Sequence, residues 1–476
     1  MSPSTQHTVT LMPGDGIGPE IMTTVSRILD AAGARIKWEI VEAGAKVFAA
    51  GDASGVSREA LDSLSRNRVA LKGPLETPVG FGGKSANVTL RKYFETFANI
   101  RPVKELPSIQ TPFSGRDIDL VVVRENVEDL YAGIEHMQTP DVAQCLKLIS
   151  LKGCLKIART AFALAENQKR PTLHVATKAN IMKQTEGMFK RACESVAPDY
   201  PTVALKHILI DNCAHQLVIC PEQFDVIVTT NMNGDIISDL TSGLVGGLGI
   251  APSANLGHDC AIFEAVHGSA PDIAGQNKAN PLALLLSSVM LLRHLGEVTC
   301  AYKLEQAIHK TLAEAKALPG DIAKGRPAAS TSAFCDAIIE QLSHVKAPDL
   351  DIPLANAVPL PKREDAISIR SKVERMVVGI DVFIEFDGQA QALGQRLDKI
   401  VESSPMQLKM ISNRGTLVYP ASGADTDCVN HWRCRFIARE ASVEPEPQVF
   451  LKLLEAIHQA GLEWMHLEKL QRFNEE

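Results

Sequence analysis

Short apolar runs alternate with amphipathic helical patterns along about the first 345 residues, and this alternation constrains the fold more than any other feature. The apolar runs include Thr8–Met12, Ile36–Val41, Leu120–Arg124 and Val226–Thr230, and helical patterns such as Leu155–Gln168 lie between most of them. Strands that alternate with helices form largely parallel sheets, because the helix provides the crossover between parallel strands. The sequence therefore predicts an α/β fold.

The pattern changes after about residue 345, where several prolines follow one another closely. They are Pro348, Pro353, Pro359 and Pro361. This spacing predicts a proline-rich linker over residues 346–365. Beyond it, residues 366–476 have the order strand, helix, strand, strand, helix, strand, which is typical of a small α+β domain of the ferredoxin-like type. The predicted organisation is a region 1–345, the linker and this C-terminal domain.

Composition excludes several classes of protein. The net charge of −7 disfavours a dedicated nucleic-acid binder. No apolar run reaches the length of about 18 residues that spans a membrane, and the longest, Pro281–Leu292, is interpreted as a buried helix. The 10 cysteines include no C-x-x-C pair, which favours reduced thiols and a cytoplasmic location.

A glycine-rich turn, Gly14 to Gly18, follows the first predicted strand. A dinucleotide-binding Rossmann turn needs glycines in the pattern G-x-G-x-x-G. Counted from Gly14, the third glycine position holds Pro19 instead. We therefore interpret the segment as a tight strand-to-helix turn and not as a Rossmann fingerprint.

Polar residues follow the predicted strands at the positions where ligands of parallel sheets bind. The basic and small polar ones are Ser85, Asn87, Arg91, Arg101 and Arg124. Three arginines suit a substrate with several carboxylates, because guanidinium groups bind carboxylates in bidentate fashion. The alternative is a set of solvated surface arginines.

Tyr131 and Lys178 also follow apolar strands and are candidate proton-transfer groups. A partly buried aromatic ring and a solvated lysine are the alternatives. Asp211, Asp235 and Asp239 form an acidic group, and the last two share one helical face. Carboxylates with few nitrogen or sulfur neighbours favour Mg²⁺ or Mn²⁺. Helix capping by Asp235 and a solvated face for Asp239 remain alternatives.

Three long motifs resemble those of the β-decarboxylating dehydrogenases, the isocitrate and 3-isopropylmalate dehydrogenases. They are NMNGDIISD at 231–239, GLGIAPSAN at 247–255 and EAVHGSAP at 264–271. The likeness covers roughly residues 7–343 and implies a two-lobed fold that is not a Rossmann fold, with a small lobe at roughly 125–250. The residues after 345 resemble the extra C-terminal domain of some longer bacterial isocitrate dehydrogenases.

The resemblance implies a role for each candidate residue in metal-dependent oxidative decarboxylation. Isocitrate would be bound by Thr77, Ser85, Asn87, Arg91, Arg101 and Arg124. Tyr131 and Lys178 would be the acid/base groups, and Asp211, Asp235 and Asp239 would hold the metal. Lys178 and Asp211 would serve the neighbouring subunit's site, so the resemblance implies a homodimer with shared sites, and the C-terminal domain could extend it to a higher oligomer.

The cofactor prediction rests on the loop after the motif EAVHG. The residues implied to bind the cofactor are His267, Gly268, Ser269, Ala270, Asp272, Ile273 and Asn280. In NADP-dependent members of the family that this chain resembles, a Lys-Tyr pair occupies the positions that correspond to Asp272 and Ile273 here. A carboxylate at such a position would repel the 2′-phosphate of NADP. The expected cofactor is therefore NAD.

Two alternatives to isocitrate dehydrogenase activity remain open at this point. One is the same chemistry on isopropylmalate, homoisocitrate or tartrate, against which the polar pair Ser85 and Asn87 argues. The other is a non-catalytic regulatory subunit, against which the presence of Tyr131, Lys178 and the aspartates argues.

Overall fold

The structure is a computed structural model in which two compact units can be described. The described residues are 6–76, 85–346, 373–423 and 426–473. The large unit comprises the described residues up to Ala132 and from Lys147 to Lys346. The small unit combines Gly133–Leu146 with the described residues from 373 onward.

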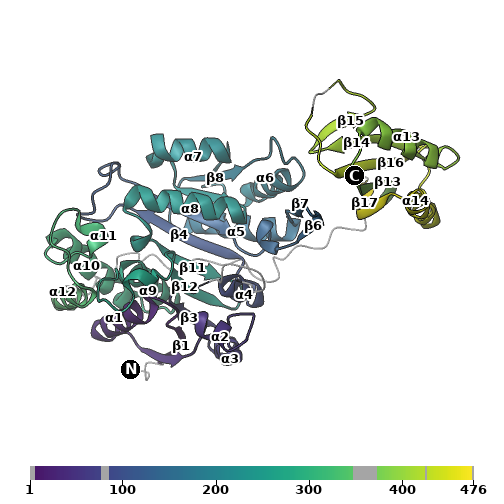
Figure 1. Cartoon of the computed structure of the whole chain (residues 1–476). Coiled ribbons are helices and arrows are strands. Elements are labelled where there is room, and N and C mark those ends of the chain that lie inside the picture. The colour runs from purple at the N-terminus through teal and green to yellow at the C-terminus, as the bar shows by residue number, and fades with distance from the viewer. Residues whose placement is uncertain (1–5, 77–84, 347–372, 424–425, 474–476) are drawn as a thin grey trace. The chain divides into compact units, whose positions relative to one another are not determined.

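A ten-stranded sheet forms the centre of the large unit (Figure 1). In order across the sheet, its strands are β2 (Ile36–Ile40), β1 (His7–Met12), β3 (Val69–Lys72), β12 (Ala261–Ala265), β11 (Pro252–Leu256), β4 (Ala98–Lys104), β5 (Asp119–Glu125), β10 (Val226–Thr229), β8 (Thr172–Thr177) and β9 (Ala204–Leu209). The strands pair in parallel, except that β11 is antiparallel to β12 and β4, and β4 is antiparallel to β5. The predicted α/β fold with a largely parallel sheet is confirmed.

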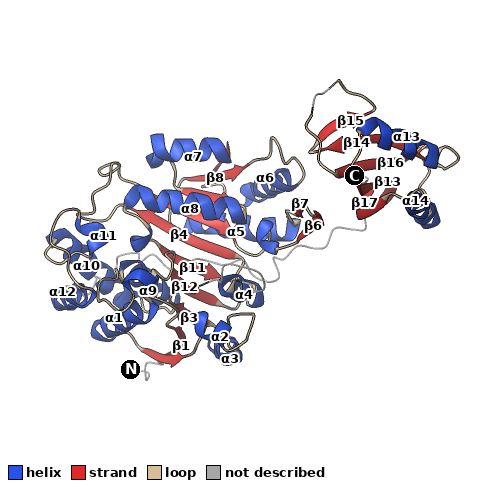
Figure 2. Ribbon diagram, viewed as in Figure 1, coloured by secondary structure: helices blue, strands red, loops and turns tan. Residues whose placement is uncertain are grey.

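Helices surround this sheet (Figure 2). They are α1 (Gly18–Ala32), α2 (Ala45–Ala49), α3 (Arg58–Asn67), α4 (Ala86–Tyr93), α5 (Leu151–Asn167), α6 (Thr185–Val196), α7 (Ile210–Ile219), α8 (Asn231–Val245), α9 (Leu282–His294), α10 (Val298–Glu314), α11 (Gly320–Ala323) and α12 (Thr331–Ser343). Helix α9 is apolar on almost every side because it is enclosed by β11, β12 and the helices α1 and α10. The prediction of a buried helix at Pro281–Leu292 is therefore confirmed.

The turn between β1 and α1 is held by close backbone packing. Gly16 has a φ of +56°, and a Cβ there would lie 2.0 Å from the carbonyl oxygen of Ser269. The next residue, Ile17, donates its backbone N–H to that same oxygen at 2.8 Å. Glycine is needed here because no side chain fits between the two backbone segments.

The small unit has a five-stranded antiparallel sheet with two helices. In order across the sheet the strands are β15 (Thr416–Tyr419), β14 (Met406–Asn413), β16 (His431–Ala438), β13 (Arg375–Glu385) and β17 (Glu463–Phe473), and the helices are α13 (Ala390–Val401) and α14 (Pro447–Gln459). A hairpin of β6 (Glu135–Thr139) and β7 (Val142–Cys145) belongs to the same unit. A separate α+β domain is confirmed, and its core centres on Trp432, whose indole N–H donates to the Phe386 carbonyl at 2.8 Å.

The predicted domain boundaries, including the small lobe at 125–250, stay predictions. Thr77 and the predicted linker 346–365, apart from Lys346, lie outside the described residues. Among the described helices, none is both long enough and apolar enough to cross a membrane.

Candidate active site

The carboxyl end of β5 carries an almost completely buried arginine against the first turns of α8. Arg124 is 1 % exposed, and its Nε and Nη2 donate to Asn231 Oδ1 at 3.1 and 2.8 Å. Its Nη1 forms an ion pair with Asp235. The glycine at 234 makes this approach possible, because a Cβ there would lie 2.5 Å from Arg124 Cγ. The motif around 231–239 thus packs directly on the strand that positions Arg124.

Tyr131, on the short 3₁₀ helix Leu130–Ala132, contacts both Arg124 and Asp235. Its hydroxyl donates to Asp235 Oδ2 at 2.6 Å, and the Arg124 guanidinium lies 5.0 Å from the ring centre. Burial raises the pKa of Tyr131, and the hydrogen bond to the Asp235 carboxylate raises it further. The phenol therefore keeps its proton at neutral pH, as a proton donor must.

A second buried guanidinium, Arg101 on β4, lies against the same helix. Arg101 donates to Asn99 Oδ1 at 2.7 Å and to Ser238, and it pairs with Asp239 at 3.4 Å and with Asp235 at 3.6 Å. Burial lowers the pKa of Arg101 to about 10, and repulsion from Arg124 and Arg91 contributes to the shift. A cluster of guanidinium groups of this kind suits the binding of a polyanion.

Unpartnered polar atoms on α4 extend this site. Arg91 pairs with Glu264 at 3.4 Å, but its Nε is buried without a hydrogen-bond partner among the described residues. Asn87 Oδ1 likewise has no partner within the described part of the chain. Ser85 lies at the N-cap of the same helix. Because buried polar atoms are nearly always bonded, the two free atoms fit a ligand that supplies the missing partners.

The predicted metal ligands fall into two places within one chain. Asp235 and Asp239 lie together beside Arg101, whereas Asp211 pairs with Lys178 at 2.9 Å and exposes 63 % of its side chain. Among the described residues, no three His, Cys, Asp or Glu side chains are grouped closely enough to hold a metal. The Asp235 and Asp239 pair offers only oxygen donors, which fits a hard divalent cation.

The structure brings most of the predicted cofactor residues to one cavity of about 400 Å³. It is lined by Ile17, Gly249, His267, Gly268, Ala270, Ile273, Lys278, Asn280, Gly320 and Asp321. Two predicted residues, Ser269 and Asp272, do not line it. The buried His267 Nε2 has no hydrogen-bond partner among the residues that the structure describes, which fits a ligand-binding role.

Sequence reasoning missed several residues of this cavity. Asp321 accepts a hydrogen bond from Asn280 Nδ2 at 2.9 Å, and Lys278 places a cation at the cavity. Lys278 could have been predicted from the sequence, because it lies two residues before Asn280, which was predicted to bind the cofactor. Asp321 carries no such signal, because it reaches the cavity from a distant segment.

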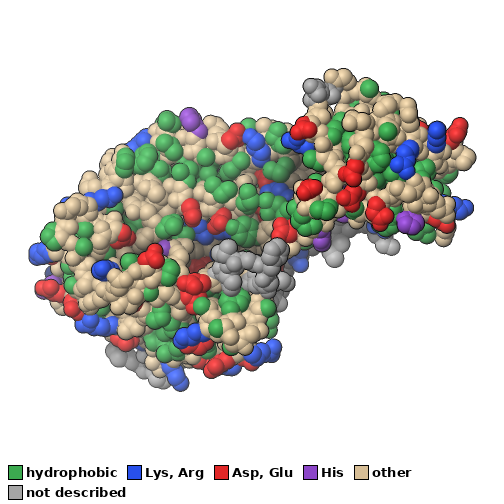
Figure 3. Space-filling model, in the orientation of Figure 1, with side chains coloured by type: hydrophobic (Ala, Val, Ile, Leu, Met, Phe, Trp, Pro, Cys, Tyr) green, Lys and Arg blue, Asp and Glu red, His purple; other side chains and the backbone are tan. Residues whose placement is uncertain are grey.

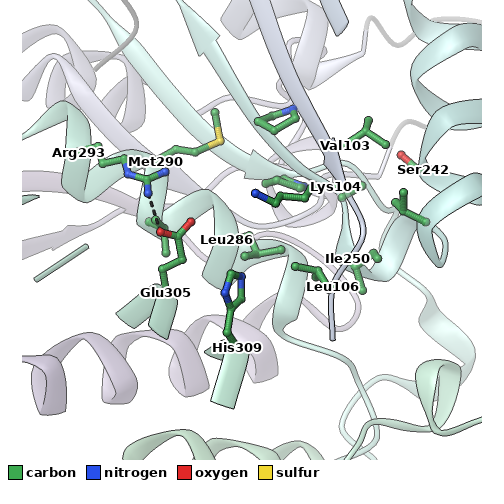
Figure 4. A pocket seen from close by; sticks show the side chains of 15 residues that line it. Val103, Lys104, Leu106, Ser242, Ile250, Leu286, Met290, Arg293, Glu305 and His309 are labelled. Atoms are coloured by element: carbon green, nitrogen blue, oxygen red, sulfur yellow. Dashed lines mark hydrogen bonds and ion pairs between the residues drawn. The ribbon is translucent and has the colours of Figure 1, made fainter. Parts of the chain in front are cut away.

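A different cavity, of about 100 Å³, lies between β4, α8, α9 and α10 (Figure 4). Its walls are mostly apolar, and the ion pair of Arg293 with Glu305 at 2.7 Å lies at its edge together with His309. None of the predicted site residues lines it. The cavity is therefore separate from the candidate active site.

Comparison with known proteins agrees with this arrangement. The family model described as isocitrate/isopropylmalate dehydrogenase matches residues 8–338, and the model described as the C-terminal domain of bacterial isocitrate dehydrogenase matches residues 375–476. The chain is 55 % identical to the isocitrate dehydrogenase [NADP] of Thermus thermophilus, covering 98 % of this chain and 94 % of the relative. It is 38 % identical to the isocitrate dehydrogenase [NADP] of Rickettsia bellii, covering 98 % and 96 %. A crystal structure of a protein from Thermus thermophilus superimposes with a TM-score of 0.94 at 54 % identity, covering 98 % and 94 %.

These relatives show that the expectation of NAD is wrong, because both are named for NADP. The structure supplies a physical reason for the error. The expectation assumed that the Asp272 carboxylate faces the cofactor, but Asp272 is exposed and does not line the cavity. The charged side chains that line the cavity are those of Lys278 and Asp321, and the lysine is attractive to a phosphate.

The two matched family models together cover most of the chain. The first covers most of the large unit, and the second covers the described C-terminal part of the small unit. The chain therefore belongs to the isocitrate/isopropylmalate dehydrogenase family and carries the C-terminal domain of the bacterial isocitrate dehydrogenases.

Proposed function

We propose that this protein oxidises isocitrate, with NADP⁺ as the hydride acceptor and Mg²⁺ or Mn²⁺ as the metal, and releases CO₂ and 2-oxoglutarate. The observation that carries the proposal is the buried group of Arg91, Arg101 and Arg124 around Asp235 and Tyr131. A polycarboxylate can pair with three guanidinium groups at once, because each guanidinium binds a carboxylate in bidentate fashion. The polar start of α4 suits a third carboxylate better than an alkyl group.

Hydride transfer comes first in this reaction, because only the resulting β-keto acid loses CO₂ readily. The arginines hold the carboxylates of the substrate and fix its orientation. Lys178 of the partner subunit takes up the hydroxyl proton as the hydride leaves. After CO₂ has left, Tyr131 donates its proton to the carbon of the enolate, and its raised pKa keeps that proton available. A divalent cation bound by Asp235 and Asp239 would supply positive charge for the developing enolate.

A homodimer with shared sites follows from the same proposal. The pair of Lys178 and Asp211 makes no contact with Asp235 or Tyr131 among the described interactions, so another subunit would have to supply it. Hydrophobic side chains gather over α7 and α8 on the surface of the large unit (Figure 3). Those of Ile219 and Ile236 are 52 % and 57 % exposed. A second copy covering this face would remove that apolar surface from water.

Steady-state kinetics on the homogeneous protein tests the reaction and the cofactor. With isocitrate and Mg²⁺ we expect a higher kcat/KM for NADP⁺ than for NAD⁺. The Lys278→Ala variant should lose activity with NADP⁺ more than with NAD⁺, and the Lys324→Ala variant is a matched control on a lysine that does not line the cavity. A higher kcat/KM with NAD⁺ would contradict the cofactor proposal. Turnover of isopropylmalate, homoisocitrate or tartrate in place of isocitrate would contradict the substrate proposal.

The domain organisation is part of the proposal. Residues 1–345 would carry the chemistry, and residues 366–476 would contribute to assembly. Truncation near residue 346 should change the oligomeric state or the stability more than kcat. An active truncated chain with an unaltered oligomeric state would contradict this assignment.

A further inference from the structure

Behind the candidate active site, a lysine lies between two fully buried carboxylates. Lys147 Nζ is 2.6 Å from Asp129 Oδ1 and 2.7 Å from Glu186 Oε1. Both acidic side chains have no exposed surface, and the lysine side chain is 14 % exposed. Burial lowers the pKa of Lys147, but the two carboxylates outweigh this effect and the pKa is raised. We call these three residues the buried clamp.

Each carboxylate of the buried clamp also holds backbone or side-chain groups beside the candidate active site. Asp129 Oδ2 accepts the backbone N–H of Met232 at 2.9 Å, at the start of α8. Its own carbonyl accepts the N–H of Ala132 at 3.1 Å and closes the turn that carries Tyr131. Asp129 has a φ of +68°, a strained conformation that the surrounding bonds maintain. One carboxylate thus connects the Tyr131 turn to the helix that carries Asp235.

The second carboxylate of the buried clamp, that of Glu186, connects the segment that carries Lys178 to the start of α8. Glu186 Oε2 accepts the backbone N–H of Lys178 at 3.1 Å, and Glu186 Oε1 accepts the hydroxyl of Thr230 at 3.2 Å. Thr230 is the N-cap of α8. Through Lys147, the segments that carry Tyr131, Lys178 and Asp235 are therefore joined to one ammonium group.

We propose that Lys147, Asp129 and Glu186 act as positioning residues that fix the Tyr131 turn, the Lys178 segment and the start of α8 relative to one another. The proposal rests on the function proposed above for these three segments. None of the clamp residues has to touch the substrate, because the two carboxylates act through the backbone and hydroxyl groups that they hold, and Lys147 acts through the carboxylates. Without the lysine, two buried carboxylates would face each other unpaired, and at least one segment would move or take up a proton.

Two variants test the clamp, and a third is their matched control. Lys147→Met removes the shared cation. Asp129→Asn keeps the size of the side chain, and asparagine tolerates the positive φ. It removes the charge and replaces one of the two acceptor oxygens, which bind Lys147 and the Met232 N–H, with an amide NH2 that only donates. The control is Asp381→Asn in the small unit, because Asp381 is also fully buried between cations, Arg433 at 2.6 Å and Arg435 at 2.8 Å.

Hydrogen exchange and kinetics are measured on each full-length protein. In both clamp variants we expect amide exchange in residues 231–240 and around 178 to become about tenfold faster or more. We expect kcat with isocitrate to fall roughly 10- to 100-fold, because small displacements of catalytic groups cost that much. The KM for isocitrate should change less than kcat, since among the described interactions no clamp residue contacts an arginine directly and Arg124 is connected to the clamp only through its partners Asn231 and Asp235 on α8. Asp381→Asn should leave exchange in these segments and kcat unchanged.

Unaltered exchange in residues 231–240 in both clamp variants would overturn the proposal, and so would a lower melting temperature with unchanged kcat. Lys147→Arg, which keeps the cation, should restore part of the lost kcat. If Lys147→Met does not fold, hydrogen exchange and kcat are both measured on Asp129→Asn. The exchange measurement needs no turnover, so a wild-type protein that is inactive on isocitrate would contradict the proposed function without deciding the role of the clamp.

Discussion

Replacing Arg101 with methionine should stabilise the protein without ligand and weaken its affinity for isocitrate about 100-fold or more. The side chain is 7 % exposed, and its pKa is lowered from 12.5 to about 10 by burial and by the neighbouring guanidinium groups. Each pKa unit corresponds to about 1.4 kcal/mol, so the charged form destabilises the folded state by about 3 kcal/mol. Arg101 is a base with a lowered pKa, so this penalty is fully present at any pH well below about 10 and disappears as the pH rises through the unfolded value.

The substitution also removes favourable contacts, which reduces the expected gain. Asn99 Oδ1 loses its guanidinium donor, and an unsatisfied buried oxygen costs about 1–2 kcal/mol. Ser238 keeps a partner, because its hydroxyl donates to the Asp235 carbonyl at 3.0 Å. The net expectation is a gain of about 1 kcal/mol, or a rise in melting temperature of about 2 °C. A stabilised but inactive variant is a typical consequence of removing charge from a binding site.

Scanning calorimetry with and without isocitrate and Mg²⁺ measures both effects. Ligand at about 100 times its Kd should stabilise the wild type by about 2.7 kcal/mol, and this increment should disappear in Arg101→Met. The KM for isocitrate should rise about 100-fold or more, because a buried charge pair is lost. The matched control is Arg170→Met, which removes a guanidinium that is paired with Asp119 and should therefore lower stability without changing KM.

The outcome that would refute this reasoning is a ligand-free Arg101→Met protein that melts more than about 2 °C below the wild type. Such a result would mean that the contacts of Arg101 outweigh its burial and repulsion. An unchanged KM would mean that Arg101 does not bind the substrate.

Further outcomes follow from other parts of the molecule. Tyr131→Phe should lower kcat by about 10²- to 10⁴-fold while isocitrate still raises the melting temperature, and a kcat within threefold of wild type would exclude Tyr131 as the proton donor. Trp432→Ala should destabilise the small unit by about 3–5 kcal/mol, as measured by calorimetry, and a shift below about 1 kcal/mol would contradict the burial of that side chain. A thiol reagent should modify Cys145 and Cys428 rapidly in the native protein, because both are exposed, and rapid modification of the buried Cys193 would contradict its environment.

The local pattern of the sequence was sufficient for the fold and for the central part of the candidate site. Alternation of apolar strands with helices predicts the layers, and the carboxyl ends of parallel strands predict where ligands bind. Arg124 and Tyr131 could be found in this way, because Arg124 lies at the carboxyl end of the apolar strand β5 and Tyr131 lies in the segment that follows it. Asp235 and Asp239 could be placed on one face because helical periodicity relates residues four apart.

The cofactor prediction failed because it depended on the direction of one side chain. Sequence places Asp272 in the correct loop, but the loop turns through Ala270, which has a φ of +40°, and leaves Asp272 outside the cavity. A loop conformation of this kind is set by contacts with distant segments. The approach of Ser269 to the turn at Gly16 is one such contact.

The sequence by itself determined the α/β order of the large unit, the separate C-terminal domain and the chemical character of the strand ends. Only the tertiary structure decided that Lys147 lies between Asp129 and Glu186, and that Asp211 lies away from Asp235. The physical reason is that hydrophobic periodicity is a local property which neighbouring residues reveal. The pairing of buried charges depends instead on distances through space between residues far apart in the chain, and no local pattern encodes those distances.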